Sequence, residues 1–419
     1  MSSEIHASYL IIGAGVFGAS TALHLAKKYL PPATDEPIKI ILVDRPVVPY
    51  HTSASQDQSK VIRADYAGPL YTRLALEAKH LWRSDSLYKE IYHETGLIWA
   101  DMNKTNFAKD VIANYQHLGI VEDDNDAKYR LVPPSEIRRL HNGLFSRADL
   151  DNIDEIFLNA SSGWVEANKT LQNVIDAAVC TGVVKHIEAE IARLIFDDDG
   201  HVCTGAQTVD GQIILLIESV PEIPELHVGS RLSAAGLITG ILRLSQNEAS
   251  QLRSAPAFLF AGGKSQENEL KITCDISFTN TVEIFSKVYV SMPPEDCMST
   301  YSVLSAEMNR ALAAVRESIL GDGTRNHSFE DRRICWDAIT PDQNFIISAH
   351  PHCRNLFIAT GGSFHAWKFL PILGKYVVQM LEDRLDPDLA QRWFWNRDFS
   401  AGAANERMMP VRELTDIGQ

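Results

Sequence analysis

Three glycines near the start of the chain have the spacing of a dinucleotide-binding turn. Gly13, Gly15 and Gly18 form the pattern G-x-G-x-x-G. The first glycine allows a tight turn, the second lets the backbone approach a pyrophosphate, and the third allows a helix to pack closely on a strand. Asp44 follows a second apolar run and would accept hydrogen bonds from the hydroxyls of an adenosine ribose. These residues predict a bound dinucleotide but do not choose between FAD and NAD.

The segments around these residues predict the elements that position them. Residues 9–12 are a short apolar run typical of a buried parallel strand, residues 19–29 follow as a helix, and residues 38–43 form a second strand. The N-terminus of the helix offers N–H groups and a positive dipole end to the phosphates. After a second helix within 163–182, a third strand is expected beside the first. A glycine-rich turn in an unrelated α/β fold is the structural alternative.

A second strand that ends in glycine lies near the other end of the chain. Residues 355–360 are another apolar run, and they lead into Gly361, Gly362 and Ser363. An apolar stretch with helical spacing follows over 370–380. Backbone N–H groups at such a turn can reach the pyrimidine ring of a flavin, so this segment favours FAD.

Two motifs in this region resemble those of a known family. The motif C-W-D-A-I-T-P-D-Q-N-F-I-I begins at Cys335, and A-T-G-G-S-F-H-A-W-K-F-L-P ends at Pro371. Here the chain is similar to the FAD-dependent amine oxidases that include monomeric sarcosine oxidase, fructosyl-amino-acid oxidase (amadoriase), and the pipecolate and saccharopine oxidases. The resemblance implies an α+β fold. One domain would be a Rossmann-like FAD-binding domain of the glutathione-reductase/D-amino-acid-oxidase type, and the other an antiparallel-sheet substrate domain.

In this family the cysteine of the first motif carries the flavin. The resemblance therefore implies an 8α-S-cysteinyl thioether between Cys335 and FAD, with Thr340, Pro341 and Asp342 lining the ring. The residues that the resemblance and the glycine pattern together assign to FAD are Gly13, Gly15, Val16, Phe17, Gly18, Asp44, Arg45, Ser59, Lys60, Cys335, Asp337, Gly362, Ser363, Phe364, His365 and Lys368. A buried, inert thiol is the alternative for Cys335, because most lone cysteines are of that kind.

The resemblance also implies cations around the substrate. The loop 56–66 would place Lys60 near the flavin and Arg63 on the substrate carboxylate, which a planar guanidinium binds with two parallel hydrogen bonds. Lys368 would reach the same carboxylate from another side, and Tyr66 is expected to contact the substrate. A solvated surface charge is the alternative for each cation.

A lysine in a predicted strand is the third expected cation. Residues 269–275 alternate so that Lys271 points away from the side of Leu270 and Ile272. The resemblance implies that Lys271 faces the flavin and stabilises the negative charge that develops on oxygen, as a fixed cation does. An exposed strand lysine is the alternative. The expected catalytic residues are Lys271, Lys368 and Arg63.

The implied reaction is the oxidation of the C–N bond of a secondary amine. The substrate would be an N-methyl, saccharopine- or pipecolate-like, or fructosyl amino acid. Hydride transfer to covalent FAD would give an imine and, with molecular oxygen, hydrogen peroxide. The alternatives are an N-methyl-amino-acid dehydrogenase, a tailoring enzyme that uses the imine for cyclisation, and a non-catalytic flavin-binding homologue. An NAD-dependent opine-type dehydrogenase would share the glycine pattern but would not explain the Cys335 motif.

The composition indicates which kinds of partner and which compartment to expect. The 419 residues carry a formal net charge of −15, which argues against nucleic acid because phosphate binding needs a basic face. Six scattered cysteines without a C-x-x-C pair fit a reducing compartment and predict no metal site. Neither a signal peptide nor a membrane span is convincing, so we expect a cytoplasmic monomer that meets a small amino acid and oxygen.

The length of the chain exceeds what one hydrophobic core usually serves, so two domains are expected. The FAD-binding domain is predicted over 1–94, 156–219 and 326–390, the substrate-binding domain over 95–155 and 220–325, and a C-terminal tail over 391–419. Segments that the family normally has near 217–225 and 260–268 look missing. The sequence therefore makes no prediction for the roof of the active site.

Overall fold

The chain divides into two compact units. The computed structural model describes residues 8–30, 38–46, 53–55, 57–100, 106–120, 128–151, 153, 155–214, 228–252, 254–259, 264–265, 269–294, 305–321, 327–400 and 409–417. Unit 1 consists of Met1–His51, Leu171–Ser233 and Asp337–Ala403, and unit 2 consists of Thr52–Thr170, Ala234–Trp336 and Ala404–Gln419. Both units are built from segments that are distant in the sequence.

These units are defined by packing and do not coincide with the predicted binding domains. The segment 52–94, which the prediction assigns to the FAD-binding domain, packs within unit 2. The predicted domains were defined by the ligand that they bind, whereas the two units are defined by contacts within the chain, so their boundaries need not agree. The boundaries of the two binding domains therefore stay a prediction.

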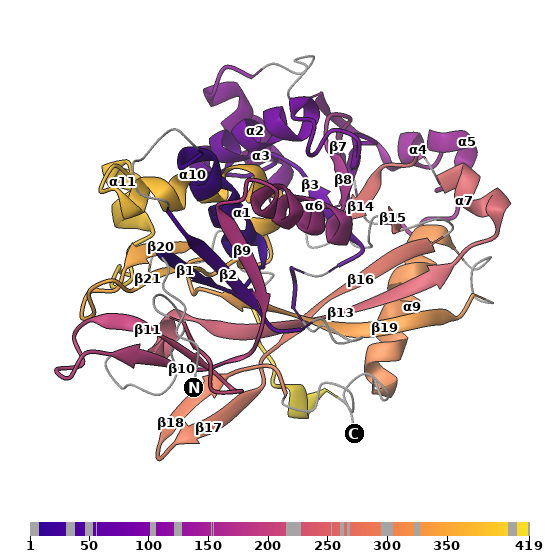
Figure 1. Ribbon diagram of the computed structural model, residues 1–419. Coiled ribbons are helices and arrows are strands. Elements are labelled where there is room, and N and C mark those ends of the chain that lie inside the picture. Colours follow the sequence, from indigo (N-terminus) through magenta and orange to yellow (C-terminus); the bar gives the residue numbers. More distant parts are fainter. Residues whose placement is uncertain are drawn as a thin grey trace. The chain divides into compact units, whose positions relative to one another are not determined.

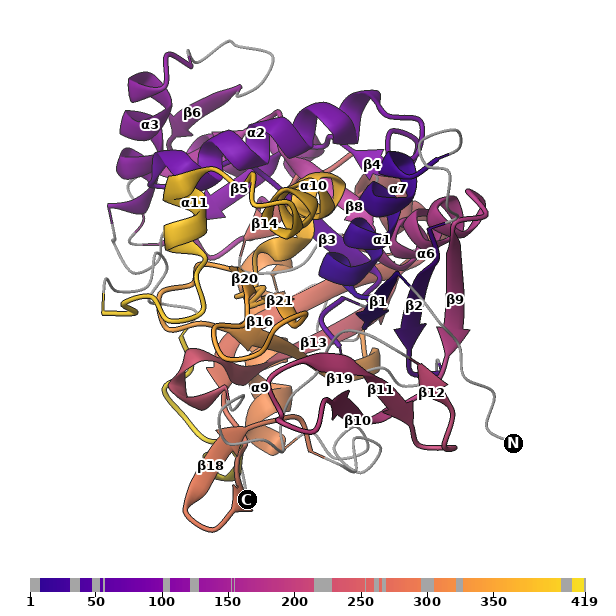
Figure 2. The same cartoon turned by 60° about the vertical axis from the view of Figure 1, so that its left-hand side comes forward.

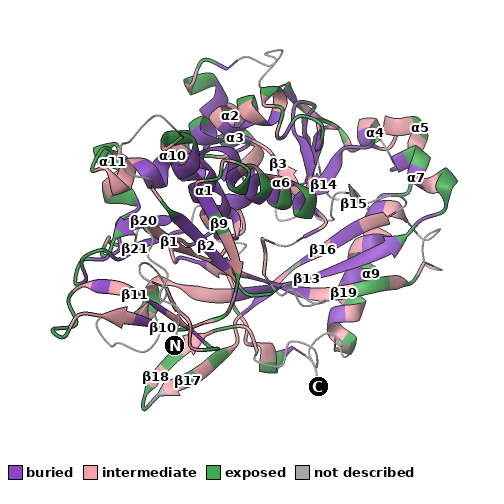
Figure 3. Cartoon of the chain, in the orientation of Figure 1, coloured by how far each residue is buried: buried purple, intermediate pink, exposed green. Residues whose placement is uncertain are grey.

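A parallel sheet of three strands forms the first part of unit 1. β1 (Tyr9–Ile12) pairs with β2 (Ile40–Asp44), and β2 pairs on its other side with β9 (Val184–Glu188) (Figure 1). β2 is buried from Ile40 to Val43, as the purple ribbon of Figure 3 shows. The expectation that the third strand lies beside the first was wrong. Both edges of a two-stranded parallel sheet offer backbone hydrogen bonds, and the apolar pattern does not say which edge is taken.

The helix after β1 packs closely on a helix from the other end of the chain. α1 (Val16–Lys28) contacts α10 (Leu370–Leu381), and a Cβ added at Gly374 would lie 2.1 Å from the Ser20 carbonyl oxygen. The Ser20 hydroxyl donates to the Leu370 carbonyl at 2.6 Å and accepts from the Gly374 N–H at 2.8 Å. In a regular helix the Gly374 N–H would donate to the Leu370 carbonyl, and here the Ser20 hydroxyl stands between them. Glycine at 374 is therefore required by the close approach of the two helices.

The remaining elements of unit 1 are mainly short antiparallel strands. They are β10 (Ile191–Phe196), β11 (Cys203–Thr208) and β12 (Ile213–Ile214) in one sheet, the pair β20 (Ile346–Ala349) and β21 (Phe357–Thr360), η2 (Gly229–Arg231), η4 (Ala366–Phe369) and α11 (Pro387–Arg392). A core of Leu10, Ile41, Val43, Leu194 and Leu356 joins β1 and β2 to this part of the unit. Apolar burial, which stabilises by roughly 25 cal/mol per Å², thus ties distant chain segments together.

A buried histidine makes the stability of unit 1 depend on pH. His350 packs against Trp395 with tilted rings, whose centroids are 5.2 Å apart. Burial and the nearby His352 and Arg231 lower the pKa of His350 from 6.5 to about 4. Between these values the unfolded chain binds more protons than the folded one, so stability falls as the pH falls. We expect this histidine to remove about 2 kcal/mol of unfolding free energy between pH 7 and pH 5.

Chemical denaturation at the two pH values measures this effect. The His350→Phe variant should lose about 2 kcal/mol less than the wild type on acidification. His117→Gln, at an exposed histidine of α3 (Phe107–His117), should behave as the wild type does. Equal losses in wild type and His350→Phe would contradict the prediction.

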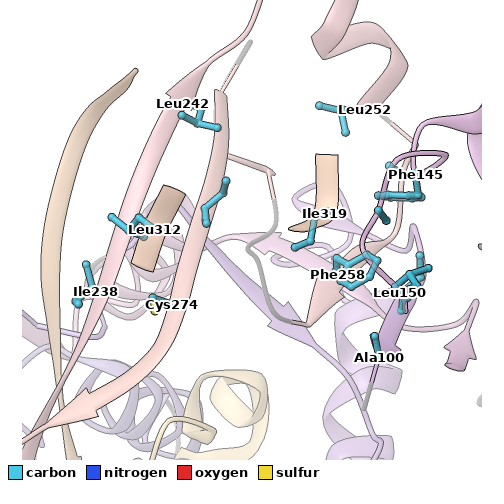
Figure 4. Packing of buried hydrophobic residues seen from close by; sticks show 14 of the residues in the cluster. Ala100, Phe145, Leu150, Ile238, Leu242, Leu252, Phe258, Cys274, Leu312 and Ile319 are labelled. Carbon is cyan, nitrogen blue, oxygen red and sulfur yellow. The ribbon is translucent and has the colours of Figure 1, made fainter. Parts of the chain in front are cut away.

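An antiparallel sheet with a helix packed on it forms the centre of unit 2. The strand order is β15 (Lys264–Ser265), β16 (Glu269–Phe278), β13 (Ser233–Arg243) and β19 (Phe329–Ile339), and α9 (Ala306–Leu320) packs on β16. Leu312 of α9 belongs to one buried cluster with Ile238 and Leu242 of β13 and Cys274 of β16 (Figure 4). The predicted antiparallel sheet is therefore present.

The other elements of unit 2 form smaller sheets and the helices around them. β14 (Ala257–Leu259), β5 (Leu97–Ala100), β7 (Ile156–Asn159) and β6 (Tyr129–Val132) form one sheet, and β3 (Ser59–Ile62), β8 (Gly163–Glu166) and β4 (Tyr92–His93) form another. β17 (Thr281–Phe285) and β18 (Val288–Ser291) form a hairpin (Figure 2). The helices are α2 (Pro69–Ser84), α3, α4 (Pro134–Ile137), α5 (Leu140–Gly143), α7 (Gln246–Leu252) and η6 (Leu414–Asp416). α6 (Ala167–Val179) continues from unit 2 into unit 1.

The two segments that depart from the family pattern fall largely outside the described residues. Residues 217–225 are not described, and of 260–268 only 264–265 are described, as β15. No helix within the described ranges combines the length and the apolar character that crossing a membrane requires.

Candidate functional site

The glycine turn between β1 and α1 has the geometry that a bound pyrophosphate needs. Gly13 has a φ of 96°, which favours glycine, and a Cβ added at Gly18 would lie 1.8 Å from the Gly13 carbonyl oxygen. Gly15 is the N-cap of α1, no side chain caps the helix there, and its first turn holds no acidic residue. No Cβ at Gly13 or Gly15 therefore obstructs an anion at this helix end, and no carboxylate of the first turn competes with it.

The next strand ends beside this turn with the predicted acid. β1 and β2 are parallel neighbours, so Asp44 at the end of β2 lies at the same sheet edge as the glycines. The Asp44 carboxylate accepts the Arg45 N–H at 2.9 Å and is partly exposed. Val16 and Phe17 begin α1, and the Phe17 ring meets Phe345 edge-on at 5.6 Å. These features of unit 1 fit the adenosine and pyrophosphate parts of FAD.

The second glycine segment carries two of the predicted polar residues. Lys368 lies in η4, is buried, and donates from Nζ to the His365 carbonyl oxygen at 3.2 Å. The His365 Nε2 donates to the Gln343 carbonyl oxygen at 2.8 Å, and the ring stacks on Phe345 at 4.9 Å. His365 is thus fixed by Gln343 and Phe345, and its contact with FAD stays a prediction.

Of the four other predicted residues near this segment, three lie in a tight turn and one lies at the end of β19 and accepts a hydrogen bond from that turn. They are Asp337, Gly362, Ser363 and Phe364. The Phe364 N–H donates to Asp337 Oδ2 at 2.7 Å, and the Ser363 N–H donates to the Ala338 carbonyl oxygen at 2.9 Å. The side chain of Asp337 is therefore engaged with the backbone of the glycine segment.

The loop that follows β19 is fixed by a buried ion pair. Arg397 donates from Nε and from Nη2 to the two oxygens of Asp342, each at 2.7 Å. Burial opposes the charge, but the guanidinium holds the pKa of the Asp342 carboxyl below its usual value. Thr340 Oγ1 donates to the Asn344 carbonyl oxygen at 2.7 Å and closes the same loop. Bidentate pairs of this kind fix geometry as well as charge.

In unit 2, three cations surround one buried carboxylate. Asp57 lies just before β3 and is 1% exposed. One of its oxygens, Oδ2, contacts both Lys271 Nζ and, at 2.7 Å, Lys60 Nζ. Its other oxygen, Oδ1, lies 2.7 Å from a guanidinium nitrogen of Arg333. Lys271 is 6% exposed and also donates to the Ser59 carbonyl oxygen at 3.2 Å. We call Asp57, Lys60, Lys271 and Arg333 the basic cluster.

The basic cluster has more positive than negative charge. Burial works against ionisation of Asp57, but the three cations hold the pKa of its carboxyl well below the usual range. Burial lowers the pKa of the Lys271 ammonium, against the attraction of Asp57. Burial also acts to lower the pKa of Lys60, but Asp57 outweighs it and the pKa is raised. A further negative charge at this place would be stabilised, because the excess of buried positive charge is costly.

Cys335 lies beside the basic cluster. It is free and 5% exposed, and it follows Arg333 by two residues on β19, so both side chains are on the same face of the strand. A charge on its sulfur would interact favourably with Lys60 and with Lys271. Attachment of FAD to Cys335 stays a prediction.

Arg63 has a different environment, made of aromatic rings. Its guanidinium carbon lies 4.9 Å from the centre of the Tyr66 ring and 5.0 Å from that of Trp99, and a guanidinium nitrogen donates to the Asp65 carbonyl oxygen. Burial raises the pKa of Tyr66. The Tyr66 carbonyl accepts Asn114 Nδ2 at 2.8 Å. The rings restrict the orientations of the guanidinium.

Each unit brings together part of the predicted site. Unit 2 gathers Ser59, Lys60, Lys271 and Cys335, and unit 1 gathers the two glycine segments. Arg63 and Lys368 belong to different units, so their convergence on one carboxylate stays a prediction. Sequence reasoning missed Asp57 and Arg333. The alternation that relates Arg333 to Cys335 was a signal for the arginine, but nothing in the sequence marked Asp57 as the anion between the cations.

Within the described ranges, no group of three or more His, Cys, Asp or Glu side chains is placed to hold a metal ion. Two histidines and a cysteine occur close together in the sequence, at His350, His352 and Cys353. The ring of His350 packs at a tilt against Trp395, and the Cys353 thiol donates to the Arg354 carbonyl oxygen at 3.6 Å. The expectation that the chain holds no metal stays a prediction.

Comparison with known proteins assigns the chain to a class. Residues 8–380 match the family described as DAO, FAD dependent oxidoreductase, and the chain belongs to this family. It is 29% identical to L-saccharopine oxidase of Schizosaccharomyces pombe, over 97% of this chain and 96% of that protein. It is 22% identical to peroxisomal sarcosine oxidase of Mus musculus, over 88% and 91% of the two chains.

The solved structures show the same fold. Fructosyl peptide oxidase from E. terrenum superimposes with a TM-score of 0.82 over 99% of this chain and 98% of that one, at 20% identity. The predicted family, the fold class and FAD as the cofactor are therefore confirmed, and the chain is a FAD-dependent oxidoreductase. The expected monomeric state and cytoplasmic location stay predictions.

Proposed function

We propose that this enzyme oxidises the C–N bond of a secondary amino acid, with FAD attached covalently to Cys335 and molecular oxygen as the electron acceptor. The observation that carries the proposal is Cys335 beside Lys60 and Lys271 in unit 2. The names of two relatives point to the same donor class, because saccharopine and sarcosine both have a secondary amine next to a carboxylate. When bound, FAD supplies the redox chemistry by accepting a hydride equivalent and passing electrons to oxygen.

The basic cluster has two tasks in this proposal. Its excess positive charge would stabilise negative charge on a flavin held at Cys335. Lys271, buried and held on Asp57, is a fixed cation that stabilises negative charge developing on oxygen without reorganising. Asp57 also pairs with Lys60 and Arg333. Its single negative charge is therefore shared among three cations and does not neutralise Lys271.

The substrate carboxylate is assigned to Arg63 and Lys368. Arg63 has its orientation restricted by Tyr66 and Trp99, which reduces the entropy lost when it binds a carboxylate. Lys368 is buried and held by the His365 carbonyl, so its ammonium also has a defined position. Two positioned cations favour a guest that carries a carboxylate, and orientation of the amine against the cofactor then contributes to the rate.

Oxygen uptake with a panel of secondary amino acids tests the proposal. Saccharopine, sarcosine, pipecolate, N-methyltryptophan and a fructosyl amino acid are compared with a primary amino acid as the control. We expect at least one member to consume oxygen and release an equal amount of hydrogen peroxide. Bleaching of the flavin without oxygen uptake would show that the enzyme is a dehydrogenase and not an oxidase. No bleaching by any member, in protein that carries flavin, would reject the proposed donor class.

A further inference from the structure

Two consecutive residues of the second glycine segment have an unusual backbone conformation. Ser363 has a φ of 47° and Phe364 a φ of 61°, in the left-handed region that favours glycine. A phenylalanine rarely adopts this conformation, because its Cβ comes too close to a carbonyl oxygen. Such strain persists where the surrounding structure imposes it, and it is concentrated at functional sites.

The carboxylate of Asp337 holds this turn from the end of β19. Its Oδ2 accepts the Phe364 N–H at 2.7 Å. Its Oδ1 occupies the space beside Gly362, since a Cβ added at that glycine would lie 2.9 Å from it. A charged acceptor makes a stronger hydrogen bond than a neutral one. The aspartate and the glycine therefore form a matched pair.

The two strained residues are held in different ways. Ser363 is fixed mostly by the backbone, because its N–H donates to the Ala338 carbonyl at 2.9 Å and its hydroxyl donates to the Gly361 carbonyl at 3.1 Å. The Thr340 N–H in turn donates to the Ser363 hydroxyl at 3.2 Å. For Phe364 the described bond is to the side chain of Asp337. Removing that carboxylate releases the Phe364 end of the turn first.

We propose that Asp337 is a positioning residue, whose carboxylate keeps Phe364 in the left-handed conformation and so gives residues 361–368 the shape in which they hold FAD. The inference rests on the assignment of this segment to the cofactor in the proposed function. Lys368 depends on the same turn, because its Nζ donates to the carbonyl of His365, the residue after Phe364. Asp337 thus acts through the backbone of the segment rather than through its own contact with the flavin.

A glycine substitution can separate this role from a direct contact. Glycine adopts a positive φ without strain, so with Phe364→Gly the turn should no longer need the hydrogen bond to the Asp337 carboxylate. We expect Asp337→Ala to lower the total flavin per polypeptide, acid-released plus pellet-bound, by about tenfold. The double variant Asp337→Ala/Phe364→Gly should carry flavin to within about twofold of Phe364→Gly alone, since any contact of the Phe364 side chain with FAD is absent from both. Asn355 also has a left-handed φ, of 59°, and Asn355→Gly in the Asp337→Ala background is the matched control that should restore nothing.

Each outcome decides the inference. Recovery of flavin through Phe364→Gly, but not through Asn355→Gly, supports it. A normal flavin content in Asp337→Ala overturns it, and so does loss of flavin that Phe364→Gly does not restore. If Asp337→Ala is insoluble, Asp337→Asn with and without Phe364→Gly gives the same comparison, because an amide oxygen is a weaker acceptor. Wild-type protein that carries flavin but oxidises no secondary amino acid would reject the proposed function and leave this test valid.

Discussion

Replacing Cys335 with alanine should give a protein that is yellow when folded and loses all of its colour from the pellet on acid precipitation. The glycine turn, Asp44 and the second glycine segment remain, so FAD should still bind without the thioether. In the wild type the colour should stay with the denatured polypeptide. Visible spectra of the pellet and the supernatant after precipitation measure the difference. Nearly all of the flavin should be in the pellet of the wild type and in the supernatant of Cys335→Ala.

The control for this experiment is a second buried cysteine. Cys274 lies on β16 of the same sheet and is 2% exposed. Cys274→Ala should keep its colour in the pellet, although it loses some core packing. A wild-type pellet without colour would show that FAD is not covalently attached. A coloured Cys335→Ala pellet would show that another residue carries the flavin.

Replacing Lys271 with methionine should slow the reaction of the reduced enzyme with oxygen by about 10²–10³-fold, the usual cost of removing one preorganised electrostatic group. Anaerobic reduction by the amine should change by about threefold or less, because Lys271 is not assigned to the amine. The fold should tolerate the change, since Asp57 keeps Lys60 and Arg333 as partners. Stopped-flow absorbance measures the two half-reactions separately.

An exposed lysine of the same unit serves as the control. Lys89 is 49% exposed and pairs weakly with Glu90, so Lys89→Met should leave both half-reactions unchanged. If Lys271→Met reacts with oxygen at the wild-type rate, the assignment of Lys271 to oxygen fails. If both half-reactions slow equally, Lys271 positions the cofactor rather than acting on oxygen.

Local patterns in the sequence were sufficient for the nucleotide turn. Gly13 has a positive φ and Gly18 approaches the Gly13 carbonyl oxygen, so both requirements are local and the spacing alone predicts where the turn forms. The Cys335 motif was recognised by resemblance and not from physical pattern. The structure then places Lys60 and Lys271 beside it, although these residues come from distant strands.

Long-range pairing was not predictable in the same way. Asp57 is one aspartate among many, and its importance arises only because β3, β16 and β19 bring three cations to it. The position of β9 at the edge of β2 was missed because both edges of the sheet were equally suitable by pattern. The charged pair Asp342–Arg397 joins a loop to the C-terminal segment, and no spacing rule relates the two residues.

The contact of Ser20 with Gly374 has a consequence for the order in which this protein can mature. α1 leaves the ribosome early, but its partner helix α10 is synthesised more than three hundred residues later, at a separation of 354 between the bonded residues. Domains usually fold as units during translation, and here the nucleotide-binding helix lacks its partner until more than three hundred further residues have been synthesised. We therefore expect nascent chains that stop before Leu370 to expose the apolar side of α1 and to be recognised by chaperones.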